Sequence, residues 1–95
     1  MEKITLRRDR DNEKSSGGKI LLSYKKVFPN GDITFANIVN ESGDVELHYL
    51  TPEGTRGGAR FVGALPENIQ KNREQYKKRI KSYFKQEGYE ASLTG

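Results

Sequence analysis

The chain has 95 residues and no cysteine, with 32% charged and 33% hydrophobic residues and a formal net charge of +4 at pH 7. This length fits one domain with a thin core, and the lack of cysteine excludes a disulfide framework, a thiol nucleophile and a cysteine-ligated metal. No apolar run approaches the roughly 18 residues of a membrane span and the Met-Glu-Lys start does not resemble a signal peptide, so we expect an intracellular, cytoplasmic protein without membrane contact.

The N-terminal segment, residues 1–18, is predicted to hold a strand or arm followed by a mobile loop. Residues 3–8 alternate, with Ile4 and Leu6 on one side, which is typical of a half-buried strand. An arm that orders only against a partner has the same pattern. Residues 9–18, DRDNEKSSGG, are all polar with mixed charge and paired glycines, which favours a loop.

The remaining residues, 19–95, are expected to form a single domain that starts with a meander. Two alternating segments, 19–28 and 33–39, flank the sequence Pro-Asn-Gly-Asp, whose Asn and Gly accept the positive φ of a tight hairpin turn. A second turn at 40–44 leads into a third alternating segment, 45–50. These three segments predict three consecutive antiparallel strands.

The next stretch, residues 51–63, reads TPEGTRGGARFVG and predicts a flexible connection into a short strand at 60–62. Its glycines and arginines allow two interpretations. In one, the glycines let the backbone approach phosphate while Arg56 and Arg60 fork onto phosphate oxygens beside a stacking aromatic residue. In the other, the stretch is a mobile hairpin loop whose arginines face water.

Residues 65–88 carry the one long helical pattern of the chain. Pro66 and Glu67 suit a first helical turn, and Gly88 suits the left-handed residue that ends a helix. At 100° per residue, the apolar side chains fall in an arc about 100° wide, namely Leu65, Ile69, Tyr76, Ile80, Tyr83 and Phe84.

The opposite side of this helix is basic. Residues 71–85 contain seven basic residues and one acidic residue, a net charge of +6, whereas residues 1–50 balance at eight of each. A basic stripe on a rigid helix could follow a phosphate backbone. It is equally typical of a solvated helix face, with Glu74 and Lys78 forming an i,i+4 pair.

Together these elements predict an α+β fold, with an antiparallel four- to five-stranded meander sheet followed by one C-terminal amphipathic helix that covers one face. Because the core is thin, we expect a homodimer.

Residues 45–75, VELHYLTPEGTRGGARFVGALPENIQKNREQ, resemble the end of the single-strand-binding transcriptional coactivator family known as positive cofactor four. The shared pattern is an apolar strand, a hairpin of glycine, proline and arginine, a short strand and a Pro-Glu helix start. The resemblance implies a curved four-stranded sheet that dimerises through its helix and binds unpaired DNA. It places the hairpin cations at Arg56 and Arg60.

No catalytic constellation is visible, so we expect neither an enzyme nor a metal or other cofactor. His48 is the only histidine, and there is no zinc-binding pair and no phosphate-binding loop motif. A small RNA-cleaving toxin can nevertheless be built on a basic sheet without such motifs. The set to consider for that activity is His48, Tyr49, Arg56 and Arg60.

The leading functional hypothesis is sequence-tolerant binding of nucleic acid, single-stranded rather than double-stranded. Sheet aromatics such as Tyr24, Phe35 and Tyr49 would stack on bases, although the same aromatics alternate into the expected core. The residues expected to neutralise phosphate are Arg56, Arg60, Lys25 and Lys26, with Lys78, Lys81 and Lys85 on the helix. The alternatives are a protein-binding adaptor or inhibitor, of the type found in phages and mobile elements, and the RNA-cleaving toxin.

Overall fold

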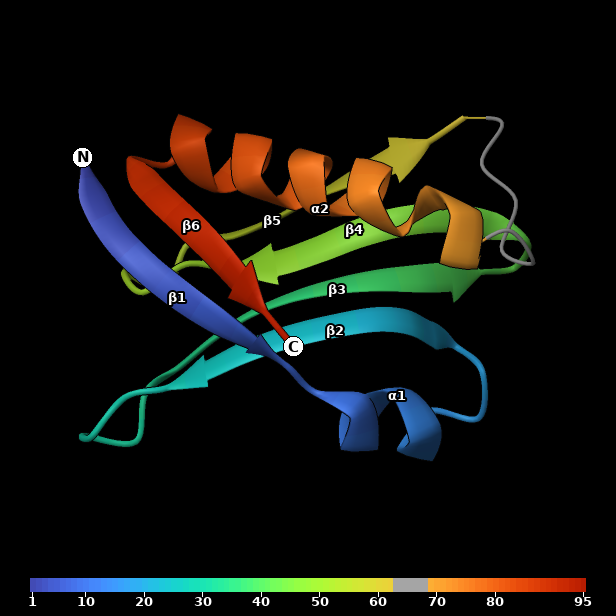
Figure 1. Cartoon of the computed structure of the whole chain (residues 1–95), viewed down its shortest axis with the longest axis horizontal. Coiled ribbons are helices and arrows are strands. Elements are labelled where there is room, and N and C mark those ends of the chain that lie inside the picture. Colours follow the sequence, from blue (N-terminus) through green and yellow to red (C-terminus); the bar gives the residue numbers. More distant parts are fainter. Residues whose placement is uncertain (63–68) are drawn as a thin grey trace.

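A curled six-stranded sheet carries one long helix across one of its faces (Figure 1). The computed structural model describes residues 1–62 and 69–95. The elements in chain order are β1 (Glu2–Arg8), α1 (Arg10–Ser15), β2 (Ile20–Val27), β3 (Ile33–Glu41), β4 (Asp44–Leu50), β5 (Arg56–Phe61), α2 (Ile69–Gln86) and β6 (Tyr89–Thr94). Within these described ranges, no helix is long and apolar enough to cross a membrane.

The strand order is β5-β4-β3-β2-β1-β6. Neighbouring strands are antiparallel except β1 and β6, which are parallel. The α+β class with a C-terminal helix is confirmed. The finer prediction of an all-antiparallel meander of four or five strands that ends in the helix is wrong, because β6 follows the helix and makes the sheet mixed.

The predicted hairpins are present, and their alternation builds the core. Gly31 (φ +92°) lies in the β2–β3 turn, and Gly43 (φ +93°) lies in the β3–β4 turn. In the middle of β2, β3 and β4, alternate residues are buried on the face beneath α2, including Leu22, Ile38 and Leu47. Hydrophobic alternation therefore fixes which face of the meander becomes the core.

The helix α2 packs its predicted apolar stripe onto this face. Tyr76, Ile80 and Phe84 are all buried. The ring of Phe84 lies 5.8 Å from the ring of Tyr49 on β4, within the range of favourable aromatic contacts. Gly88 has the predicted left-handed conformation (φ +94°). The predicted helix start at residues 65–67 lies outside the described residues.

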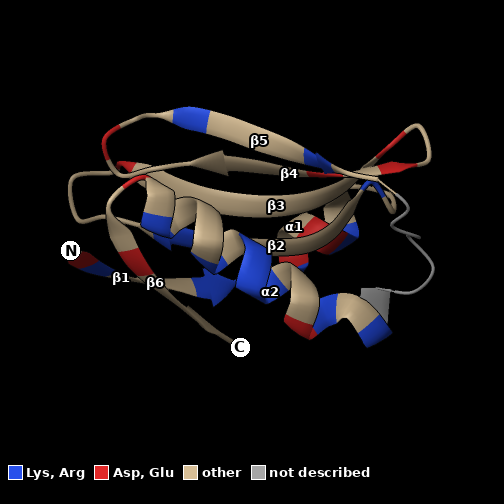
Figure 2. Ribbon diagram, turned by 90° about the horizontal axis from the view of Figure 1, so that it is seen from above, with Lys and Arg blue, Asp and Glu red and all other residues tan. Residues whose placement is uncertain are grey.

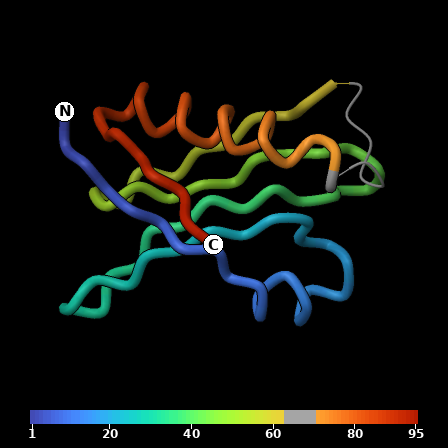
Figure 3. The backbone as a smooth tube through the Cα atoms, viewed as in Figure 1, coloured from blue at the N-terminus to red at the C-terminus, as the bar shows by residue number. Residues whose placement is uncertain are grey.

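The last strand, β6, was not predicted. The helix α2 returns the chain from β5 to the far edge of the sheet, where β6 lies along β1 (Figures 1 and 3). The parallel register pairs Ile4 with Ala91 and Leu6 with Leu93. This pairing holds β1 in the sheet, so the strand prediction for residues 3–8 is confirmed.

The segment predicted to be a mobile loop contains the short helix α1. Asp9 caps it by accepting a hydrogen bond from the backbone N–H of Asn12 at 3.1 Å. Glu13 accepts hydrogen bonds from the Arg8 guanidinium and, at 2.9 Å, from the backbone N–H of Ser23 on β2. Burial alone would raise the pKa of Glu13, but these hydrogen bonds outweigh it and hold the pKa below its ordinary value.

Candidate nucleic-acid interface

The face of the sheet opposite α2, here called the open face, carries a row of side chains across five strands. The cross-strand register pairs Arg7 with Lys25, Lys25 with Phe35, Phe35 with Leu50, and Leu50 with Arg56. Paired residues in antiparallel strands point to the same face, so these five residues form one continuous basic–apolar row. Four strand spacings of about 4.8 Å give the row a length of roughly 19 Å.

Both ends of the basic–apolar row are positively charged. Arg7, Lys25 and Arg56 are exposed, and Lys25 Nζ lies 3.1 Å from the Oδ2 atom of Asp9. Within residues 1–62 and 69–95, neither arginine has a carboxylate partner. The two arginines are therefore available to an anionic partner.

The middle of the row is apolar. Phe35 and Leu50 are half-buried and lie outside the core cluster. Beside them, the cross-strand pair Val27 and Ile33 is 57% and 44% exposed. The open face therefore presents an aromatic ring and aliphatic surface between cations, an arrangement that suits bases flanked by phosphates.

A shallow groove of about 430 Å³ adjoins the row between β4 and β5. Gly58 and His48, which pair across β4 and β5, both line the groove, and the His48 side chain is 46% exposed. Glu46 Oε1 lies 3.6 Å from His48 Nε2. Arg60 also lines the groove, but its Nε atom lies 3.9 Å from the Oδ2 atom of Asp44, so its charge is partly balanced.

The structure brings together only some of the predicted binding residues. Arg56, Arg60 and Lys25 share the open face, and Figure 2 shows basic positions at the two ends of β5. Lys26 lines the neighbouring gap between β1 and β2. The helix lysines Lys78, Lys81 and Lys85 are exposed on α2, which covers the opposite face of the sheet.

The prediction that Tyr24 and Tyr49 stack on bases is contradicted by their burial. Tyr24 is fully buried and Tyr49 is 7% exposed, because their positions in the alternation place them beneath α2. The Tyr49 hydroxyl donates a hydrogen bond to Glu87 at 3.1 Å. Burial and this hydrogen bond raise the pKa of Tyr49. Of the three aromatics considered for stacking, only Phe35 lies on the open face.

The set considered for RNA cleavage is also divided between the two faces. His48, Arg56 and Arg60 lie on the open face, whereas Tyr49 faces the core. The four side chains therefore do not surround one common point.

The glycines before Arg60 have a packing role, which corrects both loop interpretations of this stretch. Residues 56–61 form the strand β5 rather than a flexible connection. A Cβ atom on Gly57 would lie 2.3 Å from the Tyr49 hydroxyl oxygen, and one on Gly58 would lie 2.6 Å from the Leu47 carbonyl oxygen. These positions need glycine because a tyrosine ring and a neighbouring backbone occupy the space.

Arg7 and Leu50 are members of the row that the sequence interpretation left out of the site. Alternation in residues 3–8 places Arg7 on the side away from Ile4 and Leu6. It does not say which strand lies beside it. The pairing of Arg7 with Lys25 depends on the register between β1 and β2, which no local pattern reveals.

No protein-family profile, curated protein or solved structure matches the chain. The resemblance to the positive cofactor four family therefore stays a prediction, as do the homodimer and the intracellular location. The assignment of a function depends on the geometry of the open face.

Proposed function

We propose that the chain binds single-stranded nucleic acid across the open face of its sheet, with little dependence on base sequence. The observation that carries this proposal is the basic–apolar row, in which one register aligns Arg7, Lys25, Phe35, Leu50 and Arg56. Arg7 and Arg56 at the two ends of the row neutralise phosphates, and Phe35 supplies a surface on which a base stacks. Neither contact reads base edges, so the binding tolerates different sequences.

The preference for single strands follows from the middle of the row. A base can stack on Phe35 or cover Leu50 only if its face is free, and in a duplex the base faces are stacked on one another. A duplex would reach only the exposed cations at the ends of the row. We therefore expect single-stranded DNA or RNA to bind more tightly than the same sequence as a duplex.

Fluorescence anisotropy with labelled single-stranded DNA, single-stranded RNA and duplex DNA tests the proposal. Affinity for both single strands should exceed affinity for the duplex and should fall steeply between about 50 and 200 mM salt. Binding no tighter than ~100 μM at ~50 mM salt, or binding without a salt dependence, would reject the function, because phosphate contacts release counterions.

A protein partner is the second candidate, favoured by the edge strand β5. In the part of the chain that the structure describes, β5 pairs with β4 alone and ends the sheet. An unpaired strand edge is a template for an extended peptide, which adds as a further strand. This function would be favoured over the first if the chain binds no oligonucleotide but captures a partner protein, and if the Arg56→Gln variant still captures that protein.

A further inference from the structure

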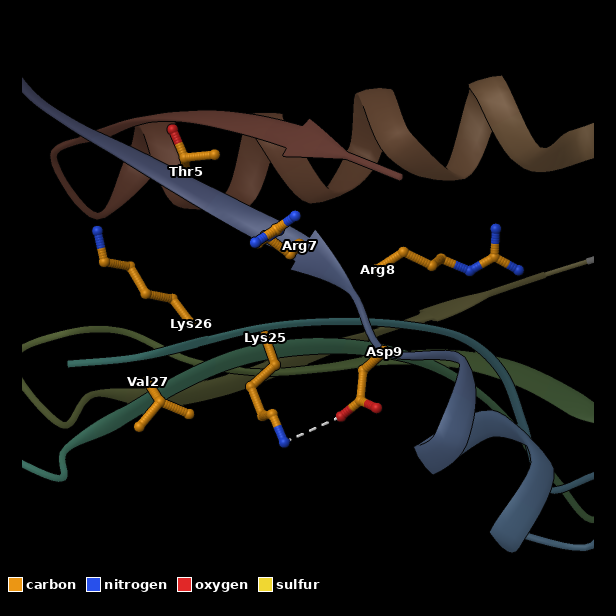
Figure 4. A pocket seen from close by; sticks show the side chains of 7 residues that line it. All are labelled: Thr5, Arg7, Arg8, Asp9, Lys25, Lys26 and Val27. Carbon is orange, nitrogen blue, oxygen red and sulfur yellow. Dashed lines mark ion pairs between the residues drawn. The ribbon is translucent and has the colours of Figure 1, made fainter.

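An open pocket of about 530 Å³ lies between β1 and β2, here called the wedge (Figure 4). The residues that line it are Thr5, Arg7, Arg8, Asp9, Lys25, Lys26 and Val27. It adjoins one end of the basic–apolar row, because Arg7 and Lys25 belong to both.

The wedge exists because β1 and β2 separate. Their pairing is limited to Arg7 with Lys25 and Arg8 with Tyr24. Continuing the register would place Thr5 opposite Val27, but β1 diverges from β2 before that point, while its other edge stays paired with β6 along its length. The backbone groups of Thr5 and Val27 that would complete the ladder therefore face the pocket, and such groups need hydrogen-bond partners.

The lining of the wedge is basic, with four cationic side chains and one carboxylate. Arg8 is bound to Glu13, with a distance of 2.9 Å from Nη2 to Oε1, and Lys25 is paired with Asp9. Those two cations are therefore balanced by carboxylates on or beside α1.

Arg7 and Lys26 are the two unbalanced cations of the wedge. Neither has a carboxylate partner within residues 1–62 and 69–95. The Lys26 ammonium lies 5.1 Å from the centre of the Phe28 ring, a cation–π contact. Successive residues of a strand point to opposite faces, so Lys26 points toward the face beneath α2, whereas Arg7 and Lys25 point to the open face. Lys26 extends from β2 into the gap, as Figure 4 shows, and Arg7 borders the gap from β1, so the two cations line the wedge from opposite faces of the sheet.

We propose that the wedge binds a phosphate monoester through Arg7 and Lys26, as the terminal phosphate of a nucleic-acid strand that lies on the open face. A terminal phosphate carries about −1.5 to −2 charges at pH 7 and three acceptor oxygens. It therefore matches two cations and free backbone N–H groups better than the single charge of an internal phosphate. A free mononucleotide offers the same group without the strand. The version of this proposal in which the phosphate is a strand end, here called the strand-end form, rests on the proposed function.

Three oligonucleotides of one sequence, with a 5′-phosphate, a 3′-phosphate or only hydroxyl ends, test the strand-end form by anisotropy. One phosphorylated end should tighten binding by about five- to tenfold, the scale of one charge-assisted contact. Lys26→Gln should abolish this gain. The matched control is Lys14→Gln, an exposed lysine on α1 outside the wedge, which should keep the gain.

A second experiment does not depend on strand binding. Inorganic phosphate and adenosine monophosphate are titrated into ¹⁵N-labelled protein. The wedge is supported as a phosphate site if the amide signals of Thr5, Arg7 and Val27 shift in the wild type and do not shift in Lys26→Gln. If these amide shifts occur but a phosphorylated strand end does not tighten oligonucleotide binding, the phosphate that the wedge binds belongs to a free mononucleotide and not to a strand end.

Absence of both the end effect and the amide shifts would overturn the proposal, as would equal responses in Lys26→Gln and Lys14→Gln. If no oligonucleotide binds but the shifts occur, the proposed function fails while the wedge site stands.

Discussion

Replacing Arg7 and Arg56 with glutamine removes the charge at both ends of the basic–apolar row. Both side chains are exposed and lack a carboxylate partner in the described residues, so the change leaves no opposite charge unpaired. At about 1 kcal/mol for each lost phosphate contact, affinity for a single strand should fall roughly thirtyfold. The slope of log K against log salt should become less steep by about 1.4, since each contact to a single strand contributes about 0.7.

The assay is fluorescence anisotropy over a salt series from about 50 to 200 mM, the range in which phosphate contacts dominate the salt dependence. The matched control is Lys78→Gln with Lys85→Gln, which also removes two positive charges and takes the formal net charge from +4 to +2. These lysines lie on α2, across the sheet from the row, so the control should keep its salt slope and lose little affinity. Equal losses in both double variants would contradict binding through the basic–apolar row, because binding would then follow net charge alone.

Three further predictions concern single residues. Phe35→Ala should weaken strand binding by about 1–3 kcal/mol, the value of one stacked base, while unchanged affinity by anisotropy would show that no base stacks there. Glu13→Gln should cost about 1–3 kcal/mol of unfolding free energy at pH 7, because Arg8, whose side chain is 7% exposed, loses its partner. Because the folded state lowers the pKa of Glu13, its contribution to the free energy of unfolding is complete above pH 4.5 and is lost as the pH falls through the folded value. In urea unfolding, the stabilities of the wild type and the variant should therefore converge in acid. A stability difference that stays constant with pH would contradict the role of Glu13. Gly57→Ala should cost about 1–3 kcal/mol because its Cβ displaces the Tyr49 ring, and an unchanged unfolding midpoint would contradict that packing.

The elements that sequence reasoning predicted well are the ones whose signals are local. Alternation and Asn-Gly turn chemistry located the β2–β3 hairpin, and the apolar arc located the buried residues of α2. The strand β6 has a local signal too, since Tyr89, Ala91 and Leu93 alternate. Its place beside β1 depends on a parallel contact between opposite ends of the chain, and no local pattern specifies such a contact.

Part of the candidate site followed from the sequence in the same way. Lys25 and Arg56 were identified by their charge, but the row that joins them is a product of register across five strands. The aromatics show the same limit. Alternation separates Tyr24 and Tyr49 from Phe35 only once each strand has been placed in register, and only the packing of α2 decides which set is covered.

The position of a bound strand on the protein shows whether nucleic acid lies on the open face. Unlabelled oligothymidine is titrated into ¹⁵N-labelled protein, and the largest amide shifts should fall on Lys25, Phe35, Leu50 and Arg56, the central and β5-side residues of the row. The amides of the exposed lysines on α2 should change little, because the helix covers the other face of the sheet. Shifts confined to α2, or no shifts at saturating oligonucleotide, would contradict binding on the open face.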